Sequence, residues 1–306
     1  MGSSQGNSAA LAVCVVLSLL LGGCAEKQGI EDPREQVAAG WSAYRLGDFT
    51  RAVACFDAAA ARTPEKSDVH VRALYGLATT WNLRRPDADP ARAEAVFKRI
   101  VEQAPEHDLA AWSLLALARM KHLVPVGDDP DYAAVRVAYQ ECIARFPDHL
   151  AGEEAFIYQQ STYVATLKQD DARQAAAALE RFIAARPRST FISPAYYLLA
   201  HCYTTLRQPD KRLAAMIRAV DTEERDPLNP IQDKALGYWM IGTIAEFEAG
   251  DLDTARKYYR LLIDEYPADI RCYGAKTALK RMDDLEARLR AEAGRGAGQG
   301  SGGAQR

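Results

Sequence analysis

The 306-residue chain lacks a strong charge of either sign. Its 38 Lys and Arg residues nearly balance its 41 Asp and Glu residues, which leaves a formal net charge of −3. No cluster of Lys or Arg stands out along the chain. Nucleic acids and anionic membrane surfaces are bound through such basic excess. We therefore expect neither a nucleic acid nor an anionic membrane surface as partner.

The chain also lacks the short motifs of catalysis and metal binding. It contains no G-x-S-x-G, no H-E-x-x-H and no P-loop. Adjacent acids such as Glu153 and Glu154 point to different faces of a helix, so they do not form an acid–base pair. Five histidines are scattered at no ligand spacing: His70, His107, His122, His149 and His201. We expect no enzyme activity, no cofactor and no metal.

Cysteine is scarce, and no two cysteines form a C-x-x-C pair of the zinc or thioredoxin type. Cys14 and Cys24 belong to the N-terminal segment treated below. The other four fall on or near the apolar face of a helical pattern: Cys55, Cys142, Cys202 and Cys272. We interpret these four as small buried hydrophobic residues. An oxidising compartment would allow a disulfide, but the sequence does not pair them.

Period-two alternation, the mark of strands, is nowhere sustained, whereas prolines recur regularly. The spacings are 41, 42, 40, 40 and 40 residues between Pro64, Pro105, Pro147, Pro187, Pro227 and Pro267. Proline cannot continue a helix, because it lacks the backbone N–H and clashes with the preceding turn. Regular prolines therefore predict regular helix ends and an internal repeat.

A small residue and a large one precede most of these prolines at fixed distances. The pairs are Ala52 and Phe56, Ala93 and Phe97, Val135 and Tyr139, Ala175 and Leu179, and Ala255 and Tyr259. Residues four apart share a helix face, so the small one admits a neighbouring helix and the large one fills the gap. The pattern resembles the second half of the tetratricopeptide signature, A-x₃-F…P. That resemblance implies an all-α solenoid of helical hairpins.

The first half of each unit is an apolar helix with a small residue where the two helices should cross. Examples are Gly40, Gly76, Ala116 and Ala200. Two units then turn through Gly47-Asp48 and Gly250-Asp251, where Gly can end one helix and Asp can cap the next. The fifth unit is irregular, with Arg212 and Met216 in place of the pair. We read Pro209-Asp210 as its turn.

The sequence thus predicts about six hairpins over residues 33–293, the last part being a C-terminal capping helix from Ala268 to Ala293. A Gly-rich segment, 294–306, is expected to be disordered. The proline period of about 40 exceeds the tetratricopeptide period of 34, and HEAT repeats of about 40–47 residues remain the alternative. The extra length falls mostly in the turns 84–90 and 123–130.

The N-terminus carries a short apolar run, Ala9 to Gly23, that is too short to span a bilayer. It ends in Leu21-Gly22-Gly23-Cys24, which resembles a bacterial lipobox. The resemblance implies a signal peptide over 1–23, a diacylated Cys24 and a lipidated tether over 24–32. The first eight residues contain no Lys or Arg, which departs from the signal pattern. An uncleaved hydrophobic anchor is the alternative.

Residues 182–279 contain the phrases FIAARPRSTFISPAYYLLAHCYTTL and YYRLLIDEYPADIRCYGAKTAL. They resemble envelope tetratricopeptide lipoproteins, such as the lipoprotein of the outer-membrane assembly machine and the periplasmic coordinator of envelope constriction. The resemblance implies a lipid-anchored scaffold of the cell envelope that faces the periplasm, on the outer membrane. Two alternative functions are a subunit of an outer-membrane protein assembly machine and an accessory factor of a cell-wall or secretion enzyme.

In such a solenoid the first helices form the wall of a concave groove. Residues just past each crossing point should face that groove and bind an unidentified envelope protein or peptide. Aromatic residues and Arg are the usual anchors of interfaces. The candidates are Trp41, Tyr44, Arg45, Trp81, Lys121, Tyr197 and His201. Several of them could instead pack the interior of a hairpin.

Overall fold

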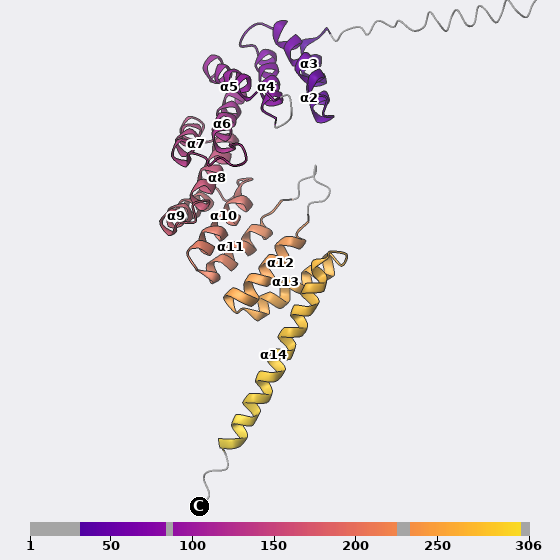
Figure 1. The fold of residues 1–306 in the computed structure, drawn as a ribbon, viewed down its shortest axis with the longest axis vertical. Coiled ribbons are helices and arrows are strands. Elements are labelled where there is room, and N and C mark those ends of the chain that lie inside the picture. Colours follow the sequence, from indigo (N-terminus) through magenta and orange to yellow (C-terminus); the bar gives the residue numbers. More distant parts are fainter. Residues whose placement is uncertain (1–30, 84–87, 225–232, 301–306) are drawn as a thin grey trace, which may run out of the picture. The chain divides into compact units, whose positions relative to one another are not determined.

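The computed structural model describes residues 31–83, 88–224 and 233–300, with side chains described as far as 293. No residue in these ranges lies in a strand. The chain folds into helical hairpins (Figure 1). The first three are α2 (Pro33–Arg45) with α3 (Phe49–Ala61), α4 (Asp68–Asn82) with α5 (Pro90–Gln103), and α6 (Asp108–His122) with α7 (Tyr132–Arg145).

The next three hairpins are followed by one more helix. They are α8 (Leu150–Val164) with α9 (Gln169–Ala185), α10 (Ile192–Thr205) with α11 (Pro209–Asp221), and α12 (Ala235–Ile244) with α13 (Leu252–Glu265). A short π-helix, η1 (Ala245–Ala249), continues α12, and α14 (Arg271–Gly300) ends the array. The predicted all-α array of six hairpins with a capping helix is confirmed.

The chain divides into two compact units, Met1–Leu117 and Ala118–Arg306. In the first unit α2 contacts α3 and α4, and α4 contacts α3 and α5. In the second unit each helix packs mainly on its sequence neighbours, while α8 also contacts α10 and α12 also contacts α14. Two pairs of first helices are thus in contact, α2 with α4 and α8 with α10.

The repeated small and large residues form the centre of the hairpins. All five small residues and all five large ones are at most 1% exposed. Second helices other than α11 end two or three residues before their prolines, for example at Ala61 before Pro64 and at Ala185 before Pro187, whereas α11 ends at Asp221. Pro227 lies outside the described residues. The pattern that the sequence revealed is thus a packing pattern.

The crossing residues are small because a ring occupies the space beside them. A Cβ atom on Gly76 would lie 2.5 Å from Cε1 of Phe56, and one on Gly242 would lie 2.6 Å from Cε1 of Tyr259. Ala200 is buried as well, whereas Ala116 is partly exposed. The predicted close approach of first and second helices is present at these glycines.

Tight turns join the two helices of several hairpins. Gly47 and Gly250 adopt φ values of 78° and 69°, and the Asp after each caps the next helix. Asp48 accepts a hydrogen bond from Arg51 N at 3.1 Å. Leu167 and Arg207 take the same left-handed conformation, both at φ 57°, without being glycine. Such a position costs a non-Gly residue about 1 kcal/mol or more, which packing of the hairpin offsets.

Three helix boundaries differ from the sequence expectation. The capping helix α14 begins at Arg271 and not at Ala268, which lies in the turn after the helix-ending proline. Pro209 is the first residue of α11 and not part of the turn, because proline suits the first helical position, where no N–H is needed. α14 continues beyond Ala293 to Gly300, although the glycines there predicted an end. Helix propensity is a weak local preference and did not end the helix at this point.

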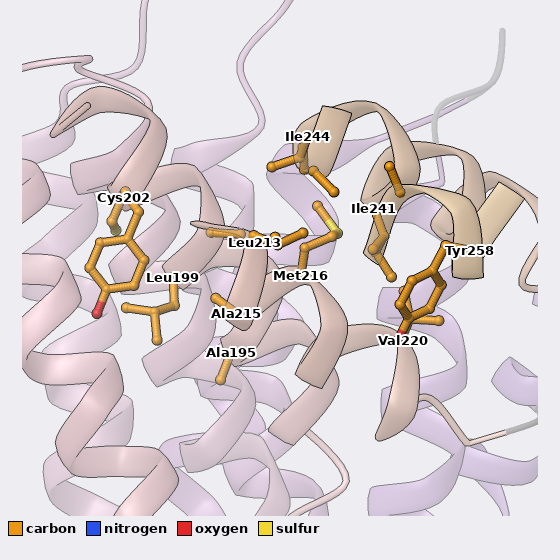
Figure 2. Close-up of a cluster of buried hydrophobic side chains, with 14 of the residues drawn as sticks. Ala195, Leu199, Cys202, Leu213, Ala215, Met216, Val220, Ile241, Ile244 and Tyr258 are labelled. Atoms are coloured by element: carbon orange, nitrogen blue, oxygen red, sulfur yellow. The ribbon is translucent and has the colours of Figure 1, made fainter. Parts of the chain in front are cut away.

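One buried core in the second unit runs from α8 to α14. Buried side chains of α10, α11, α12 and α13 meet there, among them Leu199, Met216, Ile241 and Tyr258 (Figure 2). Met216 is 1% exposed. It stands in the irregular fifth hairpin, at the helix position that the large residue of the pair takes in most other units.

No described helix is long and apolar enough to cross a membrane. Residues 1–23 and Cys24, which carry the expected signal peptide and lipid, lie outside the described residues, as does the end of the tail, 301–306.

Candidate functional site

The two aromatic candidates on α2, Trp41 and Tyr44, are partly packed into the first hairpin. The Trp41 ring lies edge-on to Phe56, with centroids 5.2 Å apart, and edge-on to Tyr44 at 5.5 Å. Tyr44 in turn meets Phe49 at 5.6 Å. Trp41 and Tyr44 remain half-buried, and Arg45 in the last turn of α2 is exposed. The structure brings these three candidates together on α2.

Trp81 belongs to the interior of the second hairpin. It is only 6% exposed. The guanidinium of Arg92 on α5 covers its ring, with Cζ 4.0 Å from the ring centroid. This cation–π contact ties α4 to α5 and leaves little of the indole for a partner.

The candidates of the second unit lie on α6 and α10. Lys121 is exposed in the last turn of α6. Tyr197 and His201 are one turn apart on α10 and so share a face, Tyr197 half-buried and His201 exposed. The Tyr197 hydroxyl lies 3.5 Å from Oε2 of Glu223. Burial, with a smaller effect of Glu223, raises the pKa of Tyr197 to about 12, so it stays a neutral donor.

Three large apolar side chains near the C-terminal end of the repeats are half exposed or more, and they lie on α12, η1 and α14. Leu236 on α12 is 50% exposed, Phe247 in η1 is 65% exposed and Tyr273 on α14 is 82% exposed. None of the three is among the predicted binding residues. The register behind that prediction would have found Phe247, which stands five residues after the small Gly242, as Arg45 stands five after Gly40.

Phe247 is held in place by contacts on both sides of it in the sequence. Glu246 accepts hydrogen bonds from Arg281 Nη2 at 2.6 Å and from the Tyr259 hydroxyl at 3.0 Å. Glu248 pairs with Arg212 of α11. The Arg281 guanidinium lies over the Phe247 ring at 5.2 Å. The π-helix thus presents an exposed ring on an anchored backbone, and single π-turns occur frequently at functional sites.

The cysteines of the described residues do not form a reactive site. Cys142, Cys202 and Cys272 are buried, as predicted, whereas Cys55 is partly exposed. Burial raises the pKa of the Cys142 thiol to about 12 and that of Cys202 to about 11. Both thiols are therefore protonated near neutral pH and are poor nucleophiles. No group of three or more His, Cys, Asp or Glu side chains in the described ranges could hold a metal ion.

The tetratricopeptide-repeat family matches the chain in three segments, residues 37–107, 193–226 and 237–269. No curated protein matches the chain. The segments cover hairpins of both units. The chain therefore contains tetratricopeptide repeats, and these segments settle the choice against HEAT repeats there.

Solved structures resemble the chain at low sequence identity. One is PilW, a widely conserved type IV pilus biogenesis factor, which has 17% identity and a TM-score of 0.51 and covers 81% of this chain and 98% of its own. MamA from Desulfovibrio magneticus RS-1 has 20% identity and a TM-score of 0.45, with 67% and 98% covered. A thermophilic tetratricopeptide protein of Thermus thermophilus has 20% identity and a TM-score of 0.28, with 81% and 98% covered. The likeness to PilW supports the fold alone.

Proposed function

Because the chain carries tetratricopeptide repeats, a fold suited to protein–protein interaction, we propose that it is a membrane-anchored scaffold of the bacterial cell envelope. A lipid on Cys24 would hold it to the membrane, facing the periplasm, on the outer membrane. Exposed side chains of the first helices and the capping helix would bind a protein or peptide partner. The observation that carries the binding role is the exposed and anchored ring of Phe247.

Phe247 has the properties of an interface anchor. An aromatic ring that becomes fully covered by a partner contributes hydrophobic energy of about 1.5–3 kcal/mol. The backbone on either side is fixed by the Glu246 and Glu248 ion pairs, so little ordering entropy opposes binding. Arg281 beside the ring offers a cation for hydrogen bonds at the edge of the contact. Leu236 and Tyr273 add exposed apolar surface on α12 and α14.

The lipobox-like sequence supports the anchoring part of the proposal. Residues 21–24 read Leu-Gly-Gly-Cys after an uncharged apolar run. A diacylated cysteine supplies two acyl chains, and stable anchoring requires two such signals where a single chain binds only reversibly. The solenoid itself needs no spanning helix for this role.

Anchoring is tested with two cysteine variants of the full chain expressed in a bacterium. Cys24→Ala should lose incorporation of a labelled fatty acid and leave the membrane fraction. Cys14→Ala, a matched change inside the apolar run, should keep both the label and the membrane location. If Cys24→Ala remains labelled and membrane-bound, the lipid anchor is wrong.

Partner binding is tested by quantitative affinity capture with the anchored chain. Phe247→Glu should lower recovery of the specific partner by about tenfold or more, a loss of about 1.4 kcal/mol. Val137→Glu is the control, since Val137 is 70% exposed but lies on the second helix α7. Equal recovery with both variants would argue against binding through the Phe247 surface.

A further inference from the structure

A concave feature lies where the third hairpin meets the fourth, apart from Phe247. A pocket of about 400 Å³ is lined by the ends of α7 and α9 and by the start of α8. Of its ten lining residues, five belong to the second helices α7 and α9, and three belong to the first helix α8. The volume is at the lower end of the range for ligand pockets and suits one or two side chains of a bound chain.

One small side chain lines the pocket at a position where another hairpin has a large one. Ala178 lines the pocket nine residues before Pro187. The same position before Pro267 holds Tyr258, which is 4% exposed and fills the space beside α13. The equivalent of Arg181, six residues before the proline, is Leu261 in that hairpin. The fourth hairpin is thus open where the sixth is filled.

The floor of the pocket is aromatic. The rings of Phe156 and Phe182 are stacked, with centroids 4.8 Å apart and planes inclined by 13°. Phe182 is 5% exposed, and Ile143 and Pro147 add apolar surface to the lining. An apolar side chain that entered here would meet an aromatic face and lose its contact with water.

Two arginines line the pocket, and only one of them forms an ion pair within the ranges that the structure describes. Arg186 is held by Glu153, with Nε 3.3 Å from Oε1, and its Nη2 donates to the carbonyl oxygen of Pro147 at 2.8 Å. Arg181 is exposed and has no ion-pair partner among the described residues. The pocket therefore combines an apolar floor with one uncompensated guanidinium, which favours a carboxylate.

We propose that this pocket binds a peptide segment in which a large apolar side chain is flanked by Asp or Glu. The apolar side chain would lie on Phe156 and Phe182, and the carboxylate would pair with Arg181. The site is separate from the Phe247 surface and does not depend on it. One scaffold would thereby hold two segments, one at Phe247 and one in this pocket.

The proposal is tested by peptide binding to the purified full chain, followed by fluorescence anisotropy. Three labelled peptides differ only at their centre, which reads Asp-Phe-Asp, Lys-Phe-Lys or Asp-Ala-Asp. The Asp-Phe-Asp peptide should bind at least about tenfold more tightly than either of the others. Equal affinities for the three peptides, or no binding of the Asp-Phe-Asp peptide, would overturn the proposal.

Variants locate the binding. Arg181→Glu should lower the affinity for the Asp-Phe-Asp peptide by about tenfold or more, because it reverses the charge that would pair with the peptide carboxylate. Ala178→Phe should abolish binding by filling the pocket, and Tyr258 shows that this position accepts an aromatic ring. Arg260→Glu, an exposed arginine on α13 with no ion-pair partner in the described part of the chain, should bind as the unmodified chain does.

Far-ultraviolet circular dichroism and thermal unfolding establish that each variant is folded. The Phe247→Glu variant should keep full affinity for the Asp-Phe-Asp peptide, which separates this pocket from the partner surface proposed above. Binding that survives Ala178→Phe, or that is lost with Phe247→Glu and not with Arg181→Glu, would place the peptide elsewhere and contradict the proposal.

Discussion

Gly40 and Phe56 are in such close contact that no side chain fits between them. A Cβ atom on Gly40 would lie 2.6 Å from Cε1 of Phe56, and the ring itself is fully buried. Gly76 of α4 approaches the same ring to a corresponding distance of 2.5 Å. Phe56 is therefore clamped between the first helices of two successive hairpins. This contact joins the first hairpin to the second.

The clamp makes Gly40→Ala a destabilising change even though Ala favours helices. Better helix propensity contributes about 1 kcal/mol, and overpacking of a tight core costs about 1–3 kcal/mol. We expect a net loss in the free energy of unfolding in urea titrations. Ser42→Ala on the same helix is exposed and should change stability by less than about 0.5 kcal/mol. A stabilised Gly40→Ala variant would contradict the clamp.

Replacing Arg136 with Lys should destabilise the folded chain. Its guanidinium lies 3.7 Å from the Tyr163 ring centroid, and it donates to Thr162 Oγ1 at 2.9 Å and to Thr162 O at 3.0 Å. A lysine ammonium lacks the planar fork that makes these contacts together. We expect Arg136→Lys to lower the free energy of unfolding by about 1–2 kcal/mol. Arg260→Lys, the exposed control, should be neutral, and equal effects of the two changes would refute the argument.

Alkaline pH should unfold the chain through its tyrosines. Burial raises the pKa of Tyr197, Tyr238 and Tyr259 to about 12, against an ordinary value of 10.0. Acidic neighbours add to the shift: Glu223, Glu265 and Glu246, respectively. The folded state thus favours the neutral phenol.

The stability that these phenols contribute is present below about pH 10 and is lost as the pH rises towards about 12. Urea midpoints should fall over that interval, and the ultraviolet absorbance of tyrosinate should rise together with unfolding. A urea midpoint that stays constant through the interval would show that the phenols are not shielded.

Much of the fold could be predicted because the repeat is a steric pattern that local residues express. Prolines end the second helices, and the pairs such as Ala52 and Phe56 are buried as their spacing predicted. The left-handed turns at Leu167 and Arg207 were not predicted, because Leu and Arg rarely adopt that conformation and so do not indicate it in a sequence. The π-helix was missed for a similar reason, because no residue type marks a single wide turn.

The binding surfaces were less predictable than the fold. Trp81 satisfied the register of a groove residue, but Arg92 covers it and it is buried. Phe247 satisfied the same register and is 65% exposed, and the ion pairs of Glu246 and Glu248 anchor the π-helix that carries it. Whether a side chain in this register faces a partner or the interior depends on its neighbours from other helices. Spacing along one helix does not contain that information.

Photo-crosslinking at residue 247 tests the central claim, protein binding by the exposed side chains of the first helices, most directly. A photoreactive phenylalanine analogue replaces Phe247 in one strain and Val137 in another, and both chains are irradiated in living cells. We predict one discrete protein adduct from position 247 and none from position 137, which is equally accessible on a second helix. No adduct at position 247, or the same adduct in equal yield at position 137, would contradict the account.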